Sequence, residues 1–306
     1  MPSTREIRRR IRSAKNISQI TRAMEMVAAS RMKRATQQAL SGRPYSERIG
    51  DLIRNLSRRL DLSDTETLNP LLLSRPIRNI TVIVFTADKG LAGALNTNVL
   101  RRTTRFILNE VNGVPVNVVA VGRKGRDFMI RYGRPLLAEF TNIGDRPTIQ
   151  DIRAIARVVS DEFVAGRTDA VYLIYTDFIN TLIQRPNVYR LLPIDVSNVG
   201  EDGALPGMNA DEQAEGRQTE VEYEYEPNDR AVLAQLLPRF VEVRLYQALL
   251  EHLASEHSSR MVAMRNATQN AKEMISDLTL SYNKLRQANI TSEIIEVSSG
   301  AAAQAR

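Results

Sequence analysis

The sequence predicts a mixed α/β fold in which a central α/β domain lies between two unusually long helices. Apolar residues recur every three or four positions over the first 60 residues and again from residue 229 almost to the end, which is the period of a coiled-coil helix. Residues 77–196 instead alternate continuous apolar runs with amphipathic stretches, as a mostly parallel sheet with covering helices does. Helices so much longer than the domain between them find a partner of matching length only in each other.

The first long helix is expected over residues 1–60. Ser3 or Thr4 can cap its start, with Glu6 reaching back as in a capping box. The pattern is interrupted at Gly42-Arg43-Pro44 and resumes afterwards. The stretch ITRAMEMVAASRMKRA places Met, Ala and Val on the apolar side, which predicts a soft, adaptable contact surface. The predicted seam comprises Ile7, Ile11, Ala14, Ile17, Thr21, Met24, Ala28, Met32 and Ala35.

The central domain is expected over residues 77–196, with strands that are apolar on both faces. Its predicted strands cover 79–85, 115–121, 136–140, 169–178 and 188–194, and its predicted helices cover 96–111, 122–133 and 148–166.

An acidic loop and a short strand are predicted over residues 197–228, before the second long helix. That helix is expected over residues 229–306, with a kink at Pro238 near its start. Between Pro238 and Gly300 no Pro or Gly interrupts its heptad register.

Charge is unevenly distributed along the chain, whose formal net charge is +7. Residues 1–60 carry 15 Lys and Arg against 4 Asp and Glu, whereas residues 197–229 carry 10 acidic residues against one Arg. Such asymmetry predicts partners of opposite charge at different ends of the molecule. No cysteine occurs, which excludes disulfides and thiolate chemistry, and no apolar run is long enough for direct membrane insertion.

No catalytic, cofactor-binding or metal site is predicted. The turn TADKGLAGALN and the later GRKG stand where phosphate loops occur, but both lack phosphate-binding signatures and are better interpreted as structural turns. His252 and His257, the only histidines, lie about 140° apart on a helix and cannot share a metal. The basic positions Arg5, Arg8, Arg9, Arg10, Arg12 and Lys15 fit a solvated helix face and an acidic partner equally well.

Four stretches, which follow one another along the chain in the family's order, resemble the γ subunit of bacterial F-type ATP synthases, the central rotor stalk. They are ITRAMEMVAASRM, ADKGLAGALN, SEHSSRMVAMRNATQNA and YNKLRQANITSEIIEVSSGAA. The resemblance implies an antiparallel coiled coil of the two terminal helices and a Rossmann-like central domain. It implies one copy per complex, turning inside a hexamer of alternating α and β subunits, with the ε subunit and the membrane ring of c subunits at its base. It also implies coupling of proton flow to ATP synthesis, control of hydrolysis, no active site of its own, and a peripheral position on the cytoplasmic face of the plasma membrane.

Site residues follow from the same resemblance by their place in its motifs. Contacts with the β subunit are implied for Met24, Arg260, Arg286, Gln287, Thr291, Glu293 and Glu296. Contacts with the membrane ring are implied for Tyr223, Tyr225 and Glu226.

Two departures from the family and two alternatives remain. Ala92 stands where many members have Cys, so thiol control is impossible here, and residues 201–220 match no family segment. A nucleic-acid-binding coiled coil would explain the basic start, although the second helix is mixed in charge. A nucleotide-dependent enzyme would explain the α/β domain, although phosphate motifs are lacking. The rotor interpretation predicts no nucleic-acid binding and no ATP hydrolysis by the isolated chain.

Overall fold

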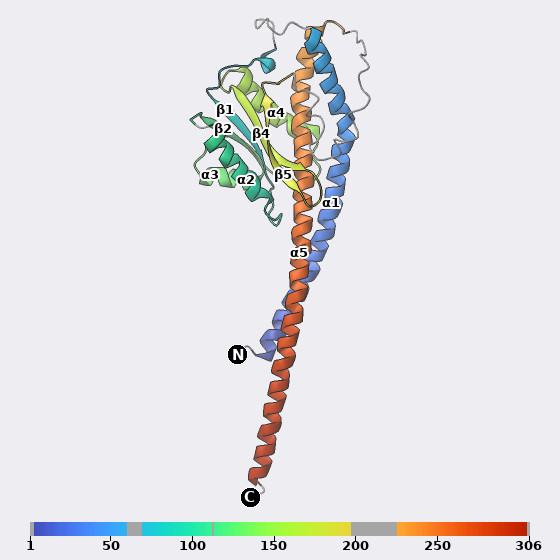
Figure 1. The fold of residues 1–306 in the computed structure, drawn as a ribbon, viewed down its shortest axis with the longest axis vertical. Coiled ribbons are helices and arrows are strands. Elements are labelled where there is room, and N and C mark those ends of the chain that lie inside the picture. Colours follow the sequence, from blue (N-terminus) through green and yellow to red (C-terminus); the bar gives the residue numbers. More distant parts are fainter. Residues whose placement is uncertain (1–2, 60–68, 112, 197–224, 305–306) are drawn as a thin grey trace. The chain divides into compact units, whose positions relative to one another are not determined.

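The computed structural model describes residues 3–59, 69–111, 113–196 and 225–304. The chain forms two compact units, which we treat separately. The paired-helix unit comprises Met1–Ala28 and Met261–Arg306, and the α/β unit comprises Ala29–Arg260. Both units contain parts of two long helices, α1 (Thr4–Arg59) and α5 (Asp229–Gln304) (Figure 1).

A five-stranded sheet in the order β3-β2-β1-β4-β5 organises the α/β unit. The first four strands are parallel, whereas β5 pairs antiparallel with β4. The strands are β1 (Ile80–Phe85), β2 (Val116–Val121), β3 (Leu136–Phe140), β4 (Ala170–Phe178) and β5 (Gln184–Leu192). The helices between them are α2 (Leu95–Arg105) with a π-helical turn (Phe106–Glu110), α3 (Arg123–Arg131) and α4 (Ile149–Val164), and a 3-10 turn (Pro70–Leu72) precedes the sheet.

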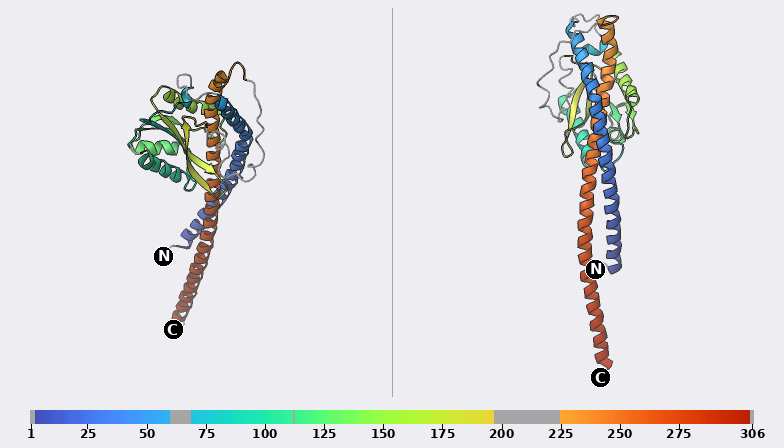
Figure 2. Two further views of the ribbon diagram at one scale, coloured as in Figure 1. Left: turned by 45° about the horizontal axis from the view of Figure 1, so that its top comes forward. Right: turned by 90° about the vertical axis from the view of Figure 1, so that its right-hand side faces the viewer.

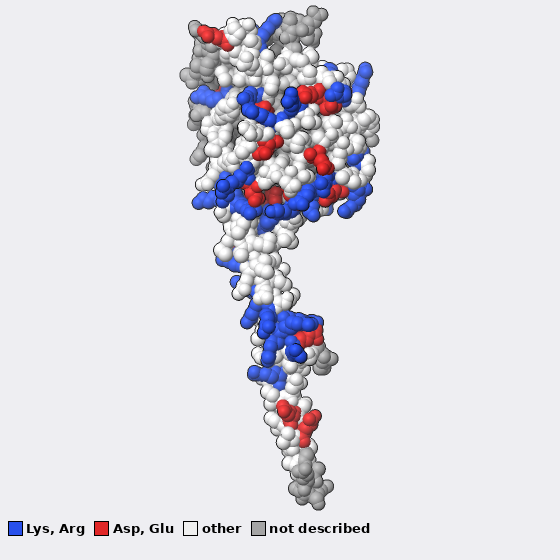
Figure 3. Space-filling view, turned by 180° about the vertical axis from the view of Figure 1, so that it is seen from behind, with Lys and Arg blue, Asp and Glu red and all other residues white. Residues whose placement is uncertain are grey.

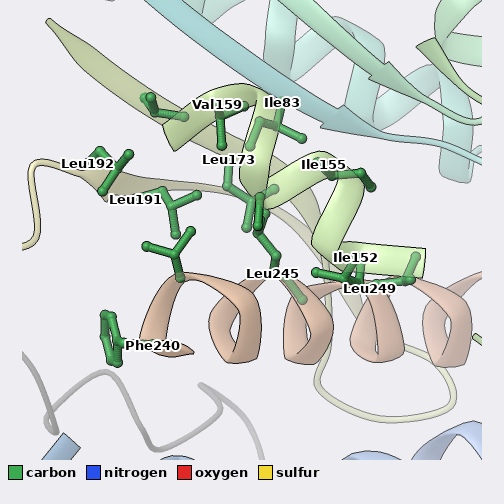
Figure 4. Packing of buried hydrophobic residues seen from close by; sticks show 14 of the residues in the cluster. Ile83, Ile152, Ile155, Val159, Leu173, Leu191, Leu192, Phe240, Leu245 and Leu249 are labelled. Atoms are coloured by element: carbon green, nitrogen blue, oxygen red, sulfur yellow. The ribbon is translucent and has the colours of Figure 1, made fainter. Parts of the chain in front are cut away.

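Two apolar clusters cover the two faces of this sheet. On one face Val99 of α2 and Met129 of α3 pack on β1 and β2. On the other face α4, the later part of α1 and the earlier part of α5 form a larger core with the sheet. Figure 4 shows Ile152 and Ile155 of α4 between the sheet and Leu249 of α5. The early part of α5 is therefore as much a core element of the α/β unit as α4 is.

In the paired-helix unit, α1 and α5 run side by side in opposite directions, and α5 continues beyond the start of α1 (Figure 2). The hydroxyl oxygens of Thr21 and Thr268 lie 2.7 Å apart, and the Arg8 Nη2 lies 2.6 Å from the Tyr282 hydroxyl. The predicted fold class, long antiparallel helices with a mostly parallel α/β sheet, is confirmed.

The apolar pattern falters at Gly42-Arg43-Pro44, but the helix does not end there: α1 continues through Pro44 to Arg59. Proline removes one helical hydrogen bond and crowds the preceding turn. Here Ala39, Ser46 and Ile49 on either side are buried, so tertiary packing holds the helix across the defect. The acidic loop and short strand predicted over 197–228 fall mostly on residues 197–224, outside the described residues.

Candidate functional site

The seam of the paired-helix unit is built from small and flexible side chains. Ile7, Ala14 and Ala28 of α1 and Met261, Met264 and Ala271 of α5 are its buried apolar residues. Thr21 and Thr268 also lie in this seam. Each donates a hydrogen bond to a carbonyl of its own helix, and the two hydroxyl oxygens lie 2.7 Å apart. Short side chains let the two helices approach closely and leave no deep ridges on this stretch.

A buried carboxylate adds the principal charged contact across this seam. Glu25 is 6% exposed. Its Oε1 accepts from Arg265 Nε at 3.0 Å, and its Oε2 accepts from Arg22 Nη1 at 2.9 Å. Burial raises the pKa of Glu25, but the hydrogen bonds from Arg265 and Arg22 outweigh it, so the pKa lies below its ordinary value. Glu25 thus stays ionised and connects α1 to α5.

Positive charge surrounds the beginning of α1 on the outside of the paired-helix unit (Figure 3). Arg8 also stacks on the Tyr282 ring, with 5.5 Å between its guanidinium carbon and the ring centre. The six basic residues that the sequence analysis singled out are all exposed: Arg5, Arg8, Arg9, Arg10, Arg12 and Lys15.

Beyond Tyr282 the end of α5 has no accompanying helix among the described residues. Residues 286–299 are all exposed, including Ile294 and Val297, at 63% and 68%. The Thr291 hydroxyl bonds only to the Gln287 carbonyl of its own helix, at 2.9 Å. Five of the predicted β-subunit contacts lie in this segment, and all are exposed: Arg286, Gln287, Thr291, Glu293 and Glu296.

The other two predicted β-subunit contacts differ in exposure. Met24 is half-buried on α1, and the neighbouring Met26 is 58% exposed. The Arg260 side chain is only 11% exposed, because it is held within the α/β unit. Its Nη2 donates to Glu256 at 2.7 Å and to the Gly90 carbonyl at 3.2 Å.

The turn after β1 is filled by the chain's own carboxylate. Asp88 accepts one hydrogen bond from the Arg123 backbone at the start of α3, at 3.0 Å, and another from the Asn142 backbone, at 2.9 Å. A helix N-terminus attracts anions, and in phosphate-binding folds a phosphate takes this place. Here Asp88 supplies the negative charge, which gives a physical basis for interpreting the turn structurally.

Gly122, at the start of α3, permits the close approach of two chain segments. It has φ +95, and a Cβ added there would overlap the carbonyl oxygen of Thr86. The Thr86 hydroxyl in turn accepts from the Gly125 backbone at 2.8 Å and donates to the Val121 carbonyl at 3.0 Å. Both glycines of GRKG therefore serve packing on Thr86.

The early part of α5 places both histidines in the interior of the α/β unit. Each is 1% exposed. Burial lowers the pKa of His252 to about 3, and among the described residues neither of its ring nitrogens has a hydrogen-bond partner. Burial and then Arg260 lower the pKa of His257 to about 4. His257 lies 3.6 Å from Asp145, but its ring is neutral at pH 7, so the pair is not ionic; Arg31 neutralises Asp145 at 2.6 Å.

Of the predicted membrane-ring contacts, two can be located. Tyr225 is half-buried against the larger core, with Arg59 5.6 Å from its ring centre. Glu226 is exposed. Tyr223 lies outside the described residues. Within the described part of the chain no group of side chains is arranged to hold a metal ion, and no helix is long and apolar enough to cross a membrane.

Comparisons with known proteins agree along the whole chain. The ATP synthase family model matches residues 3–304. The ATP synthase gamma chain of Roseiflexus sp. strain RS-1 is 54% identical over 307 residues, covering 100% of this chain and 99% of the relative. That of Chloroflexus aurantiacus strain J-10-fl is 47% identical, covering 99% of each.

Solved structures show the same fold. A chain of the Tetrahymena thermophila mitochondrial ATP synthase central stalk and c-ring matches with a TM-score of 0.59 and 27% identity, covering 81% of this chain and 99% of that one. A chain of the Euglena gracilis mitochondrial ATP synthase matches with a TM-score of 0.63 and 20% identity, covering 98% and 94%. The chain therefore belongs to the ATP synthase gamma-chain family and is a subunit of the central stalk.

Proposed function

We propose that this chain is the rotating shaft of an F-type ATP synthase. One copy turns inside a hexamer of alternating α and β subunits, with the ε subunit and the ring of membrane c subunits at its base. Proton flow through the ring turns the shaft and drives ATP release from the β subunits, and hydrolysis turns it in reverse. The chain contributes no active site and works on the cytoplasmic face of the plasma membrane as a peripheral protein.

The observation that carries this proposal is the unaccompanied end of α5. Residues 286–304 form about 28 Å of single helix at ~1.5 Å per residue. Its exposed aliphatic side chains favour a surrounding protein surface over water. Its last part, residues 297–303, consists of Val, Ser, Gly and Ala, which are too small to interlock with one fixed neighbour. A smooth enclosing sleeve satisfies both conditions, because it covers the helix and still lets it turn.

The shaft acts by making different contacts with three chemically identical β subunits. The surface of the shaft is not the same on all sides of its axis. It is formed by two different helices, α1 with a basic start and α5 with an end that is a single helix. Each β subunit therefore meets a different surface and is stabilised in a different conformation. The shaft angle then sets the nucleotide affinity of each subunit, which is allosteric coupling through differential contacts.

The predicted β-subunit contacts fit this scheme in two groups. We assign direct contact with β subunits to the half-buried Met24 and to five exposed residues of α5, Arg286, Gln287, Thr291, Glu293 and Glu296. Arg260 is enclosed by its own unit, so its contribution is indirect. At the base, Tyr225 and Glu226 are proposed to adjoin the membrane ring, together with Tyr223.

Co-expression with the α and β subunits of the same organism tests the proposal. Native mass should give one copy of this chain per hexamer, with steady ATP hydrolysis. Removal of residues 289–306 together with residues 1–28, the part of α1 that lies outside the α/β unit, should abolish steady hydrolysis, because both shaft surfaces are then lost. The shorter trim alone is the matched control. No stable complex, or hydrolysis that is indifferent to this chain, would refute the shaft proposal.

A further inference from the structure

Four residues of α5 within the α/β unit donate hydrogen bonds to backbone carbonyls of the sheet and its loops. Gly90 and Ala92 lie in the loop after β1, Thr176 lies in β4 and Thr181 follows β4; β1 and β4 are parallel neighbours in the sheet. We call these four carbonyls the collar. The bonds are Ser255 Oγ to Thr176 O (3.2 Å), Ser258 Oγ to Thr181 O (2.8 Å), Ser259 Oγ to Ala92 O (2.7 Å) and Arg260 Nη2 to Gly90 O (3.2 Å).

The donors are distributed around α5 rather than along one face. At about 100° per residue, residues 255, 258, 259 and 260 cover roughly 200° of the helix circumference. Apolar packing is not directional, so a core resists separation more than it resists rolling of a helix. Hydrogen bonds have preferred angles, so four of them on different sides oppose rotation of α5 about its own axis.

The turn that supplies two of the collar carbonyls has an unusual backbone. Leu91 has φ +63 and is 63% exposed, so its side chain gains little from burial. A non-glycine residue rarely adopts this conformation unless its surroundings enforce it. The carbonyls on either side of Leu91, those of Gly90 and Ala92, are the two that accept from Arg260 and Ser259.

The donors are themselves held in place. Ser255 and Ser258 are fully buried, and Gln184 Nε2 approaches Ser258 Oγ at 3.4 Å. Arg260 bonds to Glu256 one turn earlier, at 2.7 Å. Burial raises the pKa of Glu256. The Arg260 fork is therefore fixed on α5 before it reaches Gly90.

We propose that Ser258, Ser259 and Arg260 are positioning residues for rotary coupling, which lock the rotational angle of α5 to the sheet through the collar. This inference rests on the proposed shaft function. Torque applied to the α/β unit then passes into α5 without angular slack. Arg260 acts through α5 and not by touching a β subunit.

The test uses the assembled complex of this chain with α and β subunits. Because the chain has no cysteine, Lys124→Cys on the exposed side of α3 gives a unique site for a bead on the α/β unit. With the hexamer immobilised and stalled by a non-hydrolysable ATP analogue, the width of the bead's angular distribution reports the stiffness between the α/β unit and the held part of α5. Ser258→Ala/Ser259→Ala should broaden this distribution, because two of the collar hydrogen bonds are then lost.

The matched control is Ser276→Ala/Ser281→Ala, which removes two exposed hydroxyls of α5 outside the collar and should leave the width unchanged. An assembled collar variant with wild-type width would overturn the inference. If the double variant does not assemble, the single Ser259→Ala variant, at a half-buried position, decides on the same readout. Wild-type beads that never rotate in ATP would instead reject the shaft function itself.

Discussion

His252 is buried and its ring nitrogens have no hydrogen-bond partner among the described residues, so acidification should destabilise the folded chain and His252→Leu should remove part of this sensitivity. In the folded chain the pKa of His252 is about 3, against an ordinary value near 6.5. As the pH falls below about 6.5, His252 therefore binds a proton in the unfolded chain but not in the folded chain. Stability falls with pH until the folded pKa is reached.

Linkage gives the size of the effect. Between pH 7 and pH 5 the unfolded His252 takes up nearly one proton and the folded one almost none, so the free energy of unfolding falls by about 2 kcal/mol from this residue. His257, whose pKa is about 4, adds a similar fall. Leucine is apolar, like the neighbouring Phe85, whose ring centre lies 6.1 Å from that of His252. The substitution also removes the two buried ring nitrogens that lack a partner among the described residues.

Urea unfolding of the full chain, followed by far-ultraviolet circular dichroism at pH 7, 6 and 5, measures this effect. The wild type should lose about 2 kcal/mol more than His252→Leu over this range. His257→Leu is the companion variant, and it should also flatten the profile but leave Asp145 with only Arg31. Equal pH profiles for wild type and His252→Leu would show instead that the ring is protonated or solvated in the folded chain.

Three further substitutions probe other parts of the fold. Gly122→Ala should cost about 3 kcal/mol or more in thermal unfolding, because the new methyl group overlaps the Thr86 carbonyl; Gly113→Ala, with open space around it, should cost only about 1 kcal/mol. Asp88→Ala should cost about 1–2 kcal/mol by the same assay, since two backbone N–H groups lose their acceptor, and an unchanged melting temperature would contradict the role assigned to this carboxylate. Glu25→Gln should weaken the link between α1 and α5, with hydrogen exchange faster in residues 17–28 by about tenfold for ~1.4 kcal/mol; equal exchange rates would show that the ion pairs contribute nothing.

Periodicity predicted the long helices well and the seam in part, because both depend on residues close together in sequence. Of the predicted seam, Ile7, Ala14 and Ala28 are buried, whereas Ile17 is 50% exposed. Pro44 shows where local preference and tertiary packing differ. Its local preference predicts an interruption, but neighbouring side chains buried in the α/β unit hold the helix across it.

The site was less accessible to sequence reasoning, because its contacts join distant segments. Ser258 and Ser259 look like ordinary small residues in a helix, and nothing in the sequence indicates which carbonyls they meet. The family resemblance brought out Arg260 but gave no sign that its side chain is enclosed. Asp88 was visible only as part of a turn motif, since its two partners lie 35 and 54 residues away.

Observing rotation itself tests whether this chain turns as a shaft inside the complex. A bead attached through Lys124→Cys should turn in one direction, in three equal steps per revolution, when ATP is added to the immobilised complex with α and β subunits. The same complex with residues 289–306 and 1–28 removed should show no directed rotation. Steady ATP hydrolysis by the intact complex with a bead that only fluctuates about one angle would contradict the account.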